Sequence, residues 1–229
     1  MSALAALMPI AGLPRGFRAG LAIAFAAGLA FLLVEPLVGT AAGVALKGSG
    51  AALLAVSALQ LPAAGARWLA GIMALGALGD VLIEMPGQFA AGGASFAAGH
   101  VLAIVFYARH RAQARPGDWL VAAALLAFGL VMPPLLTPAG IPVVHTLIYA
   151  VLLTAMAACL WLSRFPRLAA LGALAFVASD TVLVLRMGGG RLISPASDGA
   201  LVWILYFGGQ CLITLGVGRG LLARAAREI

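Results

Sequence analysis

Two aspartates in otherwise apolar stretches are the residues of this sequence best suited to chemistry. Asp80 lies thirteen residues after Arg67, and Asp180 lies thirteen residues after Arg167. If both stretches are membrane helices, each carboxyl group lies about 20 Å beyond the basic edge of a core about 30 Å thick. An ionisable group there costs about 2.5–3.5 kcal/mol on insertion scales and usually marks a functional site. Asp80 and Asp180 are therefore the leading candidates for a functional site, and a structural ion pair is the alternative.

Further polar residues are expected at a similar depth, on helices that run in the opposite direction. They are Lys47, His100, His145, Tyr149, Tyr206 and Gln210. Tyr206 and Gln210 are four residues apart and share one helix face, as do His145 and Tyr149. Such residues could orient the carboxyl groups and a water molecule or bind a substrate. For Lys47 and His100, a snorkelling side chain or a packing contact is the structural alternative.

The composition places these residues in a membrane protein. Of 229 residues, 64% are hydrophobic and 9% are charged, whereas soluble domains are roughly half apolar and a quarter charged. A membrane span needs about 20 apolar residues, and the polar breaks in this chain are short, so residues 1–229 are expected to form a single transmembrane domain. The formal net charge of +7 resides in short clusters without interleaved aromatic residues, so nucleic acid is not an expected partner.

Apolar windows between Gly, Pro and Arg breaks predict eight helices. The predicted ranges are 17–36, 42–62, 67–86, 93–109, 118–136, 140–162, 167–186 and 199–219. The windows lack the alternating period of barrel strands, so an all-α, polytopic helical bundle is expected. Residues 79–83 and 99–102 resemble 179–183 and 209–212. This similarity indicates a four-plus-four repeat, which would be parallel because each half has an even number of spans.

The basic residues predict the orientation of the bundle. With eight spans, three of them fall on one face, namely Lys47, Arg186 and Arg191. The other eleven fall on the opposite face and are Arg15, Arg18, Arg67, Arg109, Arg111, Arg115, Arg164, Arg167, Arg219, Arg224 and Arg227. By the positive-inside rule, both termini are expected in the cytoplasm, with the protein in the plasma membrane.

The sequence resembles the lysoplasmalogenase family of multipass membrane proteins, also called YhhN-like. The resemblance is carried by Gly79-Asp80, by Phe89-x-x-Gly92-x-x-x-Phe96-x-x-x-His100, by Ser179-Asp180 and by Tyr206-x-x-x-Gln210. Lys47 occupies the position of a lysine of the family's second helix. Gly48 follows it where the family tends to have proline, and Ala103 stands where an aromatic residue is usual.

The resemblance implies hydrolysis of the vinyl ether bond of lysoplasmalogens to a fatty aldehyde and glycerophosphocholine or glycerophosphoethanolamine. The implied partners are a lysophospholipid, water and the bilayer, and no cofactor or metal is expected. The reaction needs a general acid and a general base, which two carboxyl groups in different protonation states can supply. Asp80 and Asp180 should then face one cavity that opens toward the outer leaflet or the lipid. The residues expected to line it and to bind substrate are Lys47, His100, Tyr206 and Gln210.

Two other classes of function fit part of the pattern. A proton-coupled small-molecule or lipid transporter would also carry membrane carboxylates and a repeat. Proline-broken helices at matching positions would favour it, but Pro133 and Pro134 have no counterparts in the other half. A zinc hydrolase would need three ligands, such as His100, His145 and an aspartate. Only these two histidines are expected inside the membrane, so the sequence offers little support for a zinc site.

Overall fold

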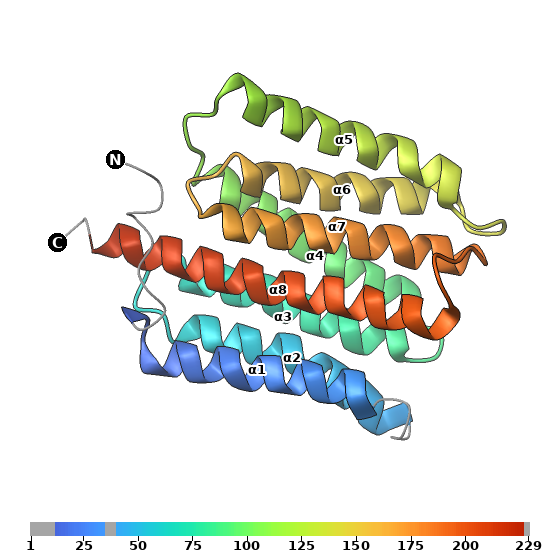
Figure 1. Ribbon diagram of the computed structural model, residues 1–229, viewed down its shortest axis with the longest axis horizontal. Helices are drawn as coiled ribbons and strands as arrows, with labels where there is room; N and C mark the ends of the chain where they lie inside the picture. The colour runs from blue at the N-terminus through green and yellow to red at the C-terminus, as the bar shows by residue number, and fades with distance from the viewer. Residues whose placement is uncertain (1–11, 35–39, 227–229) are drawn as a thin grey trace.

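The computed structural model describes residues 12–34 and 40–226, and this part of the chain forms eight helices. They are α1 (Arg15–Val34), α2 (Thr40–Leu59), α3 (Ala66–Glu84), α4 (Phe89–Ala108), α5 (Pro116–Leu136), α6 (Val143–Trp161), α7 (Arg167–Met187) and α8 (Pro195–Ala225). All run along the long axis of the molecule (Figure 1), and each is long and apolar enough to cross a membrane. The predicted all-α polytopic bundle is confirmed.

Most helix ends lie within a few residues of the predicted ones, and α8 differs most. It begins at Pro195 instead of residue 199 and continues to Ala225 instead of residue 219. The hydroxyl of Ser194 accepts a hydrogen bond from the backbone N–H of Ser197 at 3.2 Å, and proline suits the first helical position. The predicted end of the first helix at residue 36 and the basic residue Arg227 lie outside the described residues.

Helices consecutive in sequence pack against each other within each half of the chain, from α1 to α4 and from α5 to α8. The halves meet where α2 contacts α8 and where α4 contacts α6. In a parallel four-plus-four repeat, α2 corresponds to α6 and α4 corresponds to α8. The contact of α2 with α8 then corresponds to the contact of α6 with α4, as such a repeat requires. Additional contacts of α8 with α1 and α3 place α8 in the interior of the bundle.

Small residues bring α7 and α8 into backbone contact. A Cβ atom built on Gly172 would lie 2.5 Å from the carbonyl oxygen of Gly209, and one built on Gly209 would lie 2.5 Å from that of Gly172. The hydroxyl of Ser179 also donates to the carbonyl of Val202 at 2.8 Å. Close approach through glycine is common between membrane helices. It fixes Asp180, the neighbour of Ser179, relative to the polar face of α8.

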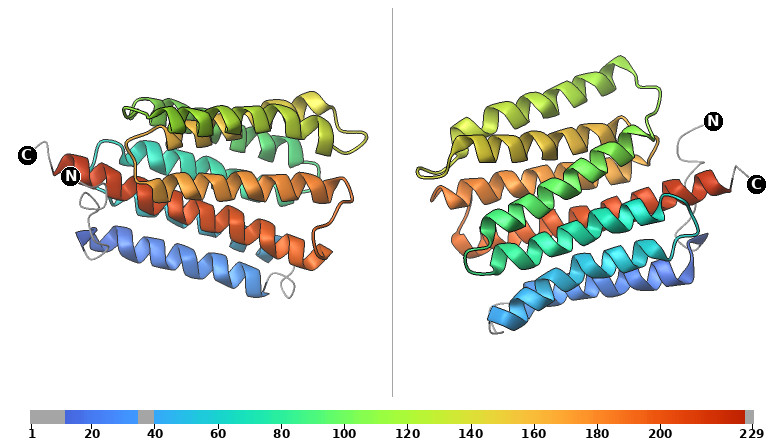
Figure 2. Two further views of the ribbon diagram at one scale, coloured as in Figure 1. Left: turned by 45° about the horizontal axis from the view of Figure 1, so that its top comes forward. Right: turned by 180° about the vertical axis from the view of Figure 1, so that it is seen from behind.

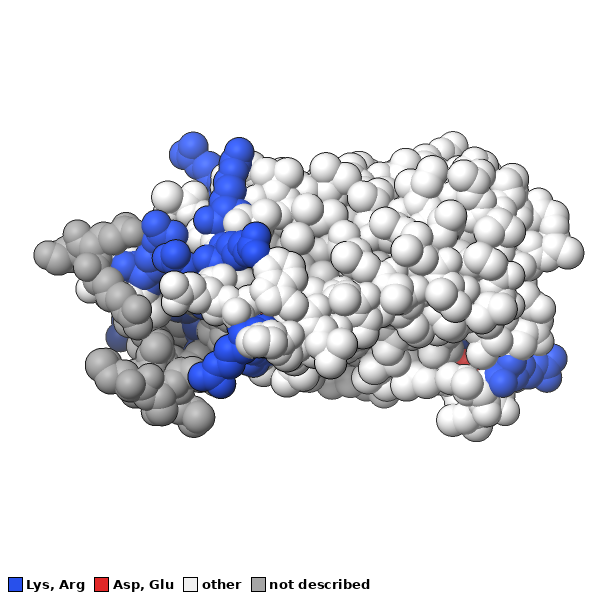
Figure 3. All heavy atoms as spheres, turned by 90° about the horizontal axis from the view of Figure 1, so that it is seen from above, with Lys and Arg blue, Asp and Glu red and all other residues white. Residues whose placement is uncertain are grey.

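Most of the described basic residues gather at one end of the bundle, which we call the basic end. It includes the start of α1, the end of α8 and the loops 109–115 and 162–166. Figure 3 shows a broad belt without charged side chains between this end and a small charged group at the far end. Three guanidinium groups stack on tryptophans at 4.4–4.7 Å, in the pairs Arg109 with Trp68, Arg111 with Trp119 and Arg167 with Trp161. Basic residues and tryptophans are enriched where helices leave a membrane.

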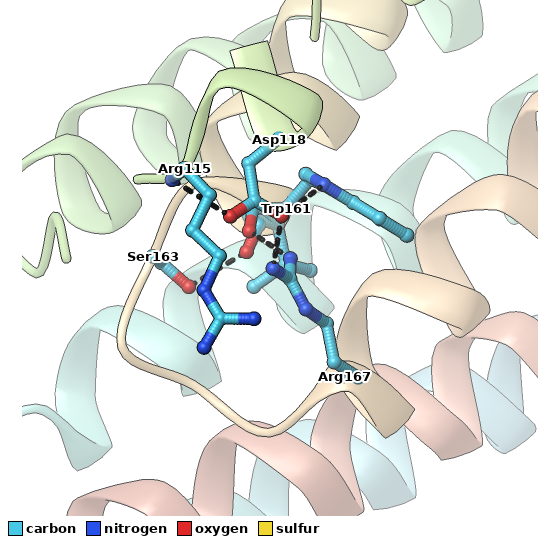
Figure 4. A network of polar contacts seen from close by, with 6 residues as sticks. Arg115, Asp118, Trp161, Ser163 and Arg167 are labelled. Carbon is cyan, nitrogen blue, oxygen red and sulfur yellow. Dashed lines mark hydrogen bonds and ion pairs between the residues drawn. The ribbon is translucent and has the colours of Figure 1, made fainter. Parts of the chain in front are cut away.

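One acidic residue of the described chain, Asp118, lies at the basic end and ties α5 to α6 and α7 (Figure 4). Its carboxylate forms an ion pair with Arg167 and accepts hydrogen bonds from Trp161 Nε1 and the Arg115 N–H, both at 3.1 Å. Elsewhere α5 lies at the margin of the bundle in all views (Figures 1 and 2) and buries few residues. The Asp118 network is therefore its main polar anchor.

The basic end should face the cytoplasm, because positively charged loops are retained there. Cysteines introduced at exposed Gln113 and Ile193, after replacement of Cys159 and Cys211 by serine, should label from opposite sides of the membrane. The measurement is reaction with an impermeant maleimide in spheroplasts and in inverted vesicles. Labelling of both positions from one side would contradict the eight-span topology.

Candidate functional site

A large cavity occupies the half of the bundle away from the basic end. Its volume is about 1080 Å³, and residues of all eight helices line it. It extends from Pro138 and Pro195 at the far end to Leu153 and Thr154 near the middle of α6. Most of the lining is aliphatic or aromatic, and Asp80 and Asp180 both belong to it. The two predicted catalytic residues thus face one apolar cavity of the size that ligand sites have.

Asp80 lies on α3 and is 1% exposed. The hydroxyl of Tyr206, on α8, donates a hydrogen bond to its carboxylate at 2.7 Å. Glycines on α3 make room for this arrangement: a Cβ atom on Gly79 would lie 2.6 Å from the ring of Phe96, and one on Gly76 would lie 3.3 Å from Gln210. The carboxyl group is therefore held by a neutral donor from the opposite half of the chain.

Asp180 lies on α7 and is partly exposed to the cavity. Its hydrogen-bond donor is the hydroxyl of Tyr149 on α6, at 2.7 Å. His100 Nε2 lies 3.5 Å from the same hydroxyl, and the two rings pack edge to face with centroids 5.4 Å apart. His100 therefore contacts the carboxyl group through Tyr149. The sequence analysis expected Tyr149 at this depth but did not include it among the site residues, although its position on one helix face with His145 was a signal for it.

His100 and Gln210 do not line the main cavity, contrary to expectation. They line a second cavity of about 20 Å³ together with Tyr107, and Phe96 and Phe176 line both cavities. The rings of Phe96 and Phe176, 6.2 Å apart, separate the two spaces. The second cavity is large enough for one water molecule, and the buried hydroxyl of Tyr107 has no hydrogen-bond partner among the described residues.

The mouth of the main cavity is charged. Lys47, expected to bind substrate, lines it in an ion pair with Glu84, and the side chains are 15% and 43% exposed. Arg186 and the exposed His145 also line it. Tyr206 is the other predicted substrate-binding residue on the lining. The sequence indicated the depth of Lys47 but not its partner, which is 37 residues away.

The cavity also opens to the side, between α4 and α6. Five residues of these two helices both line the cavity and are exposed: Phe89, Ala90 and Ala94 on α4, and His145 and Ile148 on α6. The helix α4 runs obliquely to α6 (Figures 1 and 2), and four of the six α4 residues on the cavity lining are glycine or alanine. A substrate could therefore reach the carboxyl groups from the bilayer as well as from the far end.

A metal site does not emerge from the described residues. No group of three or more His, Cys, Asp or Glu side chains among them is arranged to hold a metal ion. His100 and His145, the histidines of the zinc alternative, lie in different surroundings: His100 is buried at the second cavity, and His145 is exposed at the main one.

The tyrosine that binds Asp80 should contribute to stability. Replacement of Tyr206 by phenylalanine removes the donor to a buried carboxyl group and should lower the free energy of unfolding by about 1–3 kcal/mol. The matched control is Tyr107→Phe, which removes a buried hydroxyl without a partner among the described residues and should change stability little. Unfolding in mixed detergent micelles measures both. Equal losses would show that the Tyr206 hydroxyl contributes no specific interaction.

Comparison of the sequence with models of known protein families identifies one family. The profile of the YhhN family matches residues 42–217, more than three quarters of the chain. The matched segment contains both aspartates, both tyrosines that bind them, and Lys47, His100 and Gln210. Searches of curated proteins and of solved structures found no match. The length of the match is sufficient to conclude that the chain belongs to the YhhN family.

Proposed function

We propose that this protein is a membrane hydrolase that cleaves the vinyl ether bond of lysoplasmalogens. The products are a fatty aldehyde and glycerophosphocholine or glycerophosphoethanolamine. The observation that carries the proposal is the pair of carboxyl groups, each hydrogen-bonded by a tyrosine, on the wall of one large apolar cavity. Membership of the YhhN family is compatible with hydrolase activity.

The carboxyl pair supplies the acid and the base that the reaction needs. One carboxyl group, in its protonated form, donates its proton to the β-carbon of the vinyl ether. The other, ionised, stabilises the oxocarbenium ion and accepts a proton from the attacking water, as carboxylates do in glycosidases. The hemiacetal that forms then collapses to the aldehyde and the free glycerol hydroxyl. Tyr149 and Tyr206 hold the carboxyl groups in position.

The shape of the cavity suits a single-chain amphiphile. Its charged mouth can take the polar head, and its apolar wall and the side opening between α4 and α6 can take the chain. With both termini in the cytoplasm of a cell whose plasma membrane holds the protein, the mouth faces away from the cytoplasm. We therefore propose the outer leaflet as the source of the substrate.

The cavity favours a one-sided site over a transport path. Its lining residues come from the middle and the far half of the helices. Toward the basic end, the core is filled by fully buried side chains, including Phe17, Phe106, Tyr107 and Leu160. A transporter with the same carboxyl groups would have to repack this layer in each cycle.

Asp80→Asn and Asp180→Asn should each lower turnover by at least about 100-fold, the lower end of contributions from general acids and bases. Release of fatty aldehyde from a purified lysoplasmalogen measures the effect. Asp118→Asn is the matched control, because Asp118 lies at the basic end, away from the cavity. This control should weaken the fold without lowering the turnover of the folded protein. If either cavity variant retains near-normal turnover, that aspartate has a structural role only.

Filling the side opening should impair long-chain substrates. A side chain added at Gly93, which lines the cavity and has no neighbour within 4 Å of its Cβ position, would project into the gap. Gly93→Phe should lower kcat/KM for a long-chain substrate by at least about tenfold relative to a short-chain one. Gly208→Phe is the control, since Gly208 is equally unhindered but lies off the cavity. A uniform loss for both chain lengths would argue against chain entry between α4 and α6.

A further inference from the structure

Arg186 lines the cavity near its mouth and lies on the same helix as Asp180. It follows Asp180 by six residues, which is about 9 Å along the helix axis at 1.5 Å per residue. The cavity wall thus carries a carboxyl group in its depth and a guanidinium group above it. A substrate of the proposed reaction has two groups for these residues to bind, the vinyl ether and the phosphate. The glycerol carbons separate the two groups.

The charge of Arg186 is not neutralised by an ion pair with any described carboxylate, in contrast to that of Lys47. Its Nη2 atom lies 3.4 Å from the carbonyl oxygen of Pro195, which is a long contact. The carboxylate of Asp198 instead accepts the N–H groups of Leu192 and Ile193 at 2.9 and 3.1 Å. A Cβ atom at Gly199 would lie 3.3 Å from Nη2, so the glycine leaves space beside the guanidinium.

We propose that Arg186 binds the phosphate of the lysophospholipid whose vinyl ether bond lies at Asp80 and Asp180. This assignment rests on the proposed function. A guanidinium binds phosphate through two parallel N–H donors, and it is more weakly hydrated than an ammonium group. Lys47, which was expected to bind substrate, is less suited to the phosphate than Arg186, because its ammonium group forms an ion pair with Glu84.

The assignment has a consequence for specificity. Recognition through the phosphate selects phosphorylated single-chain lipids over neutral alkenylglycerols. Choline or ethanolamine beyond the phosphate would extend out of the mouth, past Arg186. The site should therefore accept both head groups.

Binding of two non-hydrolysable probes tests the assignment independently of catalysis. One is a 1-O-alkyl lysophosphatidylcholine, and the other is the matching neutral 1-O-alkylglycerol. In the full-length protein, Arg186→Gln should weaken binding of the phosphorylated probe by at least about tenfold, the loss expected for one charge-assisted interaction. Binding of the neutral probe should be unchanged. Arg191→Gln, at an exposed arginine outside the cavity lining, should leave both affinities unchanged.

Several outcomes would overturn the assignment. They are equal binding of the phosphorylated probe by the parent and the Arg186 variant, loss of both probes together, and an equal loss in the Arg191 variant. Displacement of the phosphorylated probe by an equal concentration of inorganic phosphate would also overturn it, because the site would then recognise free phosphate. Absence of aldehyde release by the parent protein would reject the proposed reaction, whereas the binding pattern would still report on Arg186.

Discussion

A carboxyl group inside an apolar bundle must find its hydrogen-bond donor within the protein, and this constraint organises the site. Without a donor, a buried polar group costs several kcal/mol in hydrocarbon surroundings. Tyr206 meets the requirement for Asp80 and thereby connects α8 to α3, while Tyr149 meets it for Asp180 and connects α6 to α7. The first contact joins the two halves of the chain and the second lies within the second half. The packing of these four helices and the position of the two carboxyl groups therefore depend on each other.

The two carboxyl groups would occupy equivalent places in the predicted four-plus-four repeat, but their surroundings are not equivalent. In the alignment of residues 99–102 with 209–212, Phe96 is the counterpart of Tyr206 and His100 is the counterpart of Gln210. Both tyrosine donors consequently come from the second half of the chain. Asp80 is almost fully enclosed, whereas Asp180 is partly open to the cavity and contacts His100 through Tyr149. A pair that must divide the roles of acid and base benefits from this difference, since identical sites would ionise alike.

The sequence was sufficient to predict the eight helices and the common depth of Asp80 and Asp180, because hydropathy and distance from a basic residue determine both. It was insufficient wherever the outcome depended on which way a helix is rotated. His100 and Gln210 have the predicted depth, but the rings of Phe96 and Phe176 separate them from the main cavity. The ion pair of Lys47 with Glu84 joins residues from different helices, and no local sequence pattern predicts it. The length of α8 was underestimated because Arg219 and Arg224 resemble the start of a loop.

The attachment of α5 has a consequence for motion. This helix is anchored at the basic end by Asp118, while its far half carries Pro133 and Pro134. Neither proline has an N–H group, so the carbonyls of Gly129 and Leu130 lose their usual helical partners. The segment 128–136 forms part of the cavity wall and contributes only Gly129 and Pro133 to the buried core. Local opening is cheapest where few contacts are buried and the backbone ladder is interrupted. The far half of α5 is therefore the part of the cavity wall that can open locally. Its amide protons should exchange with solvent sooner than those of α7 or α8. The cavity can widen on that side without disturbing the helices that hold the carboxyl groups.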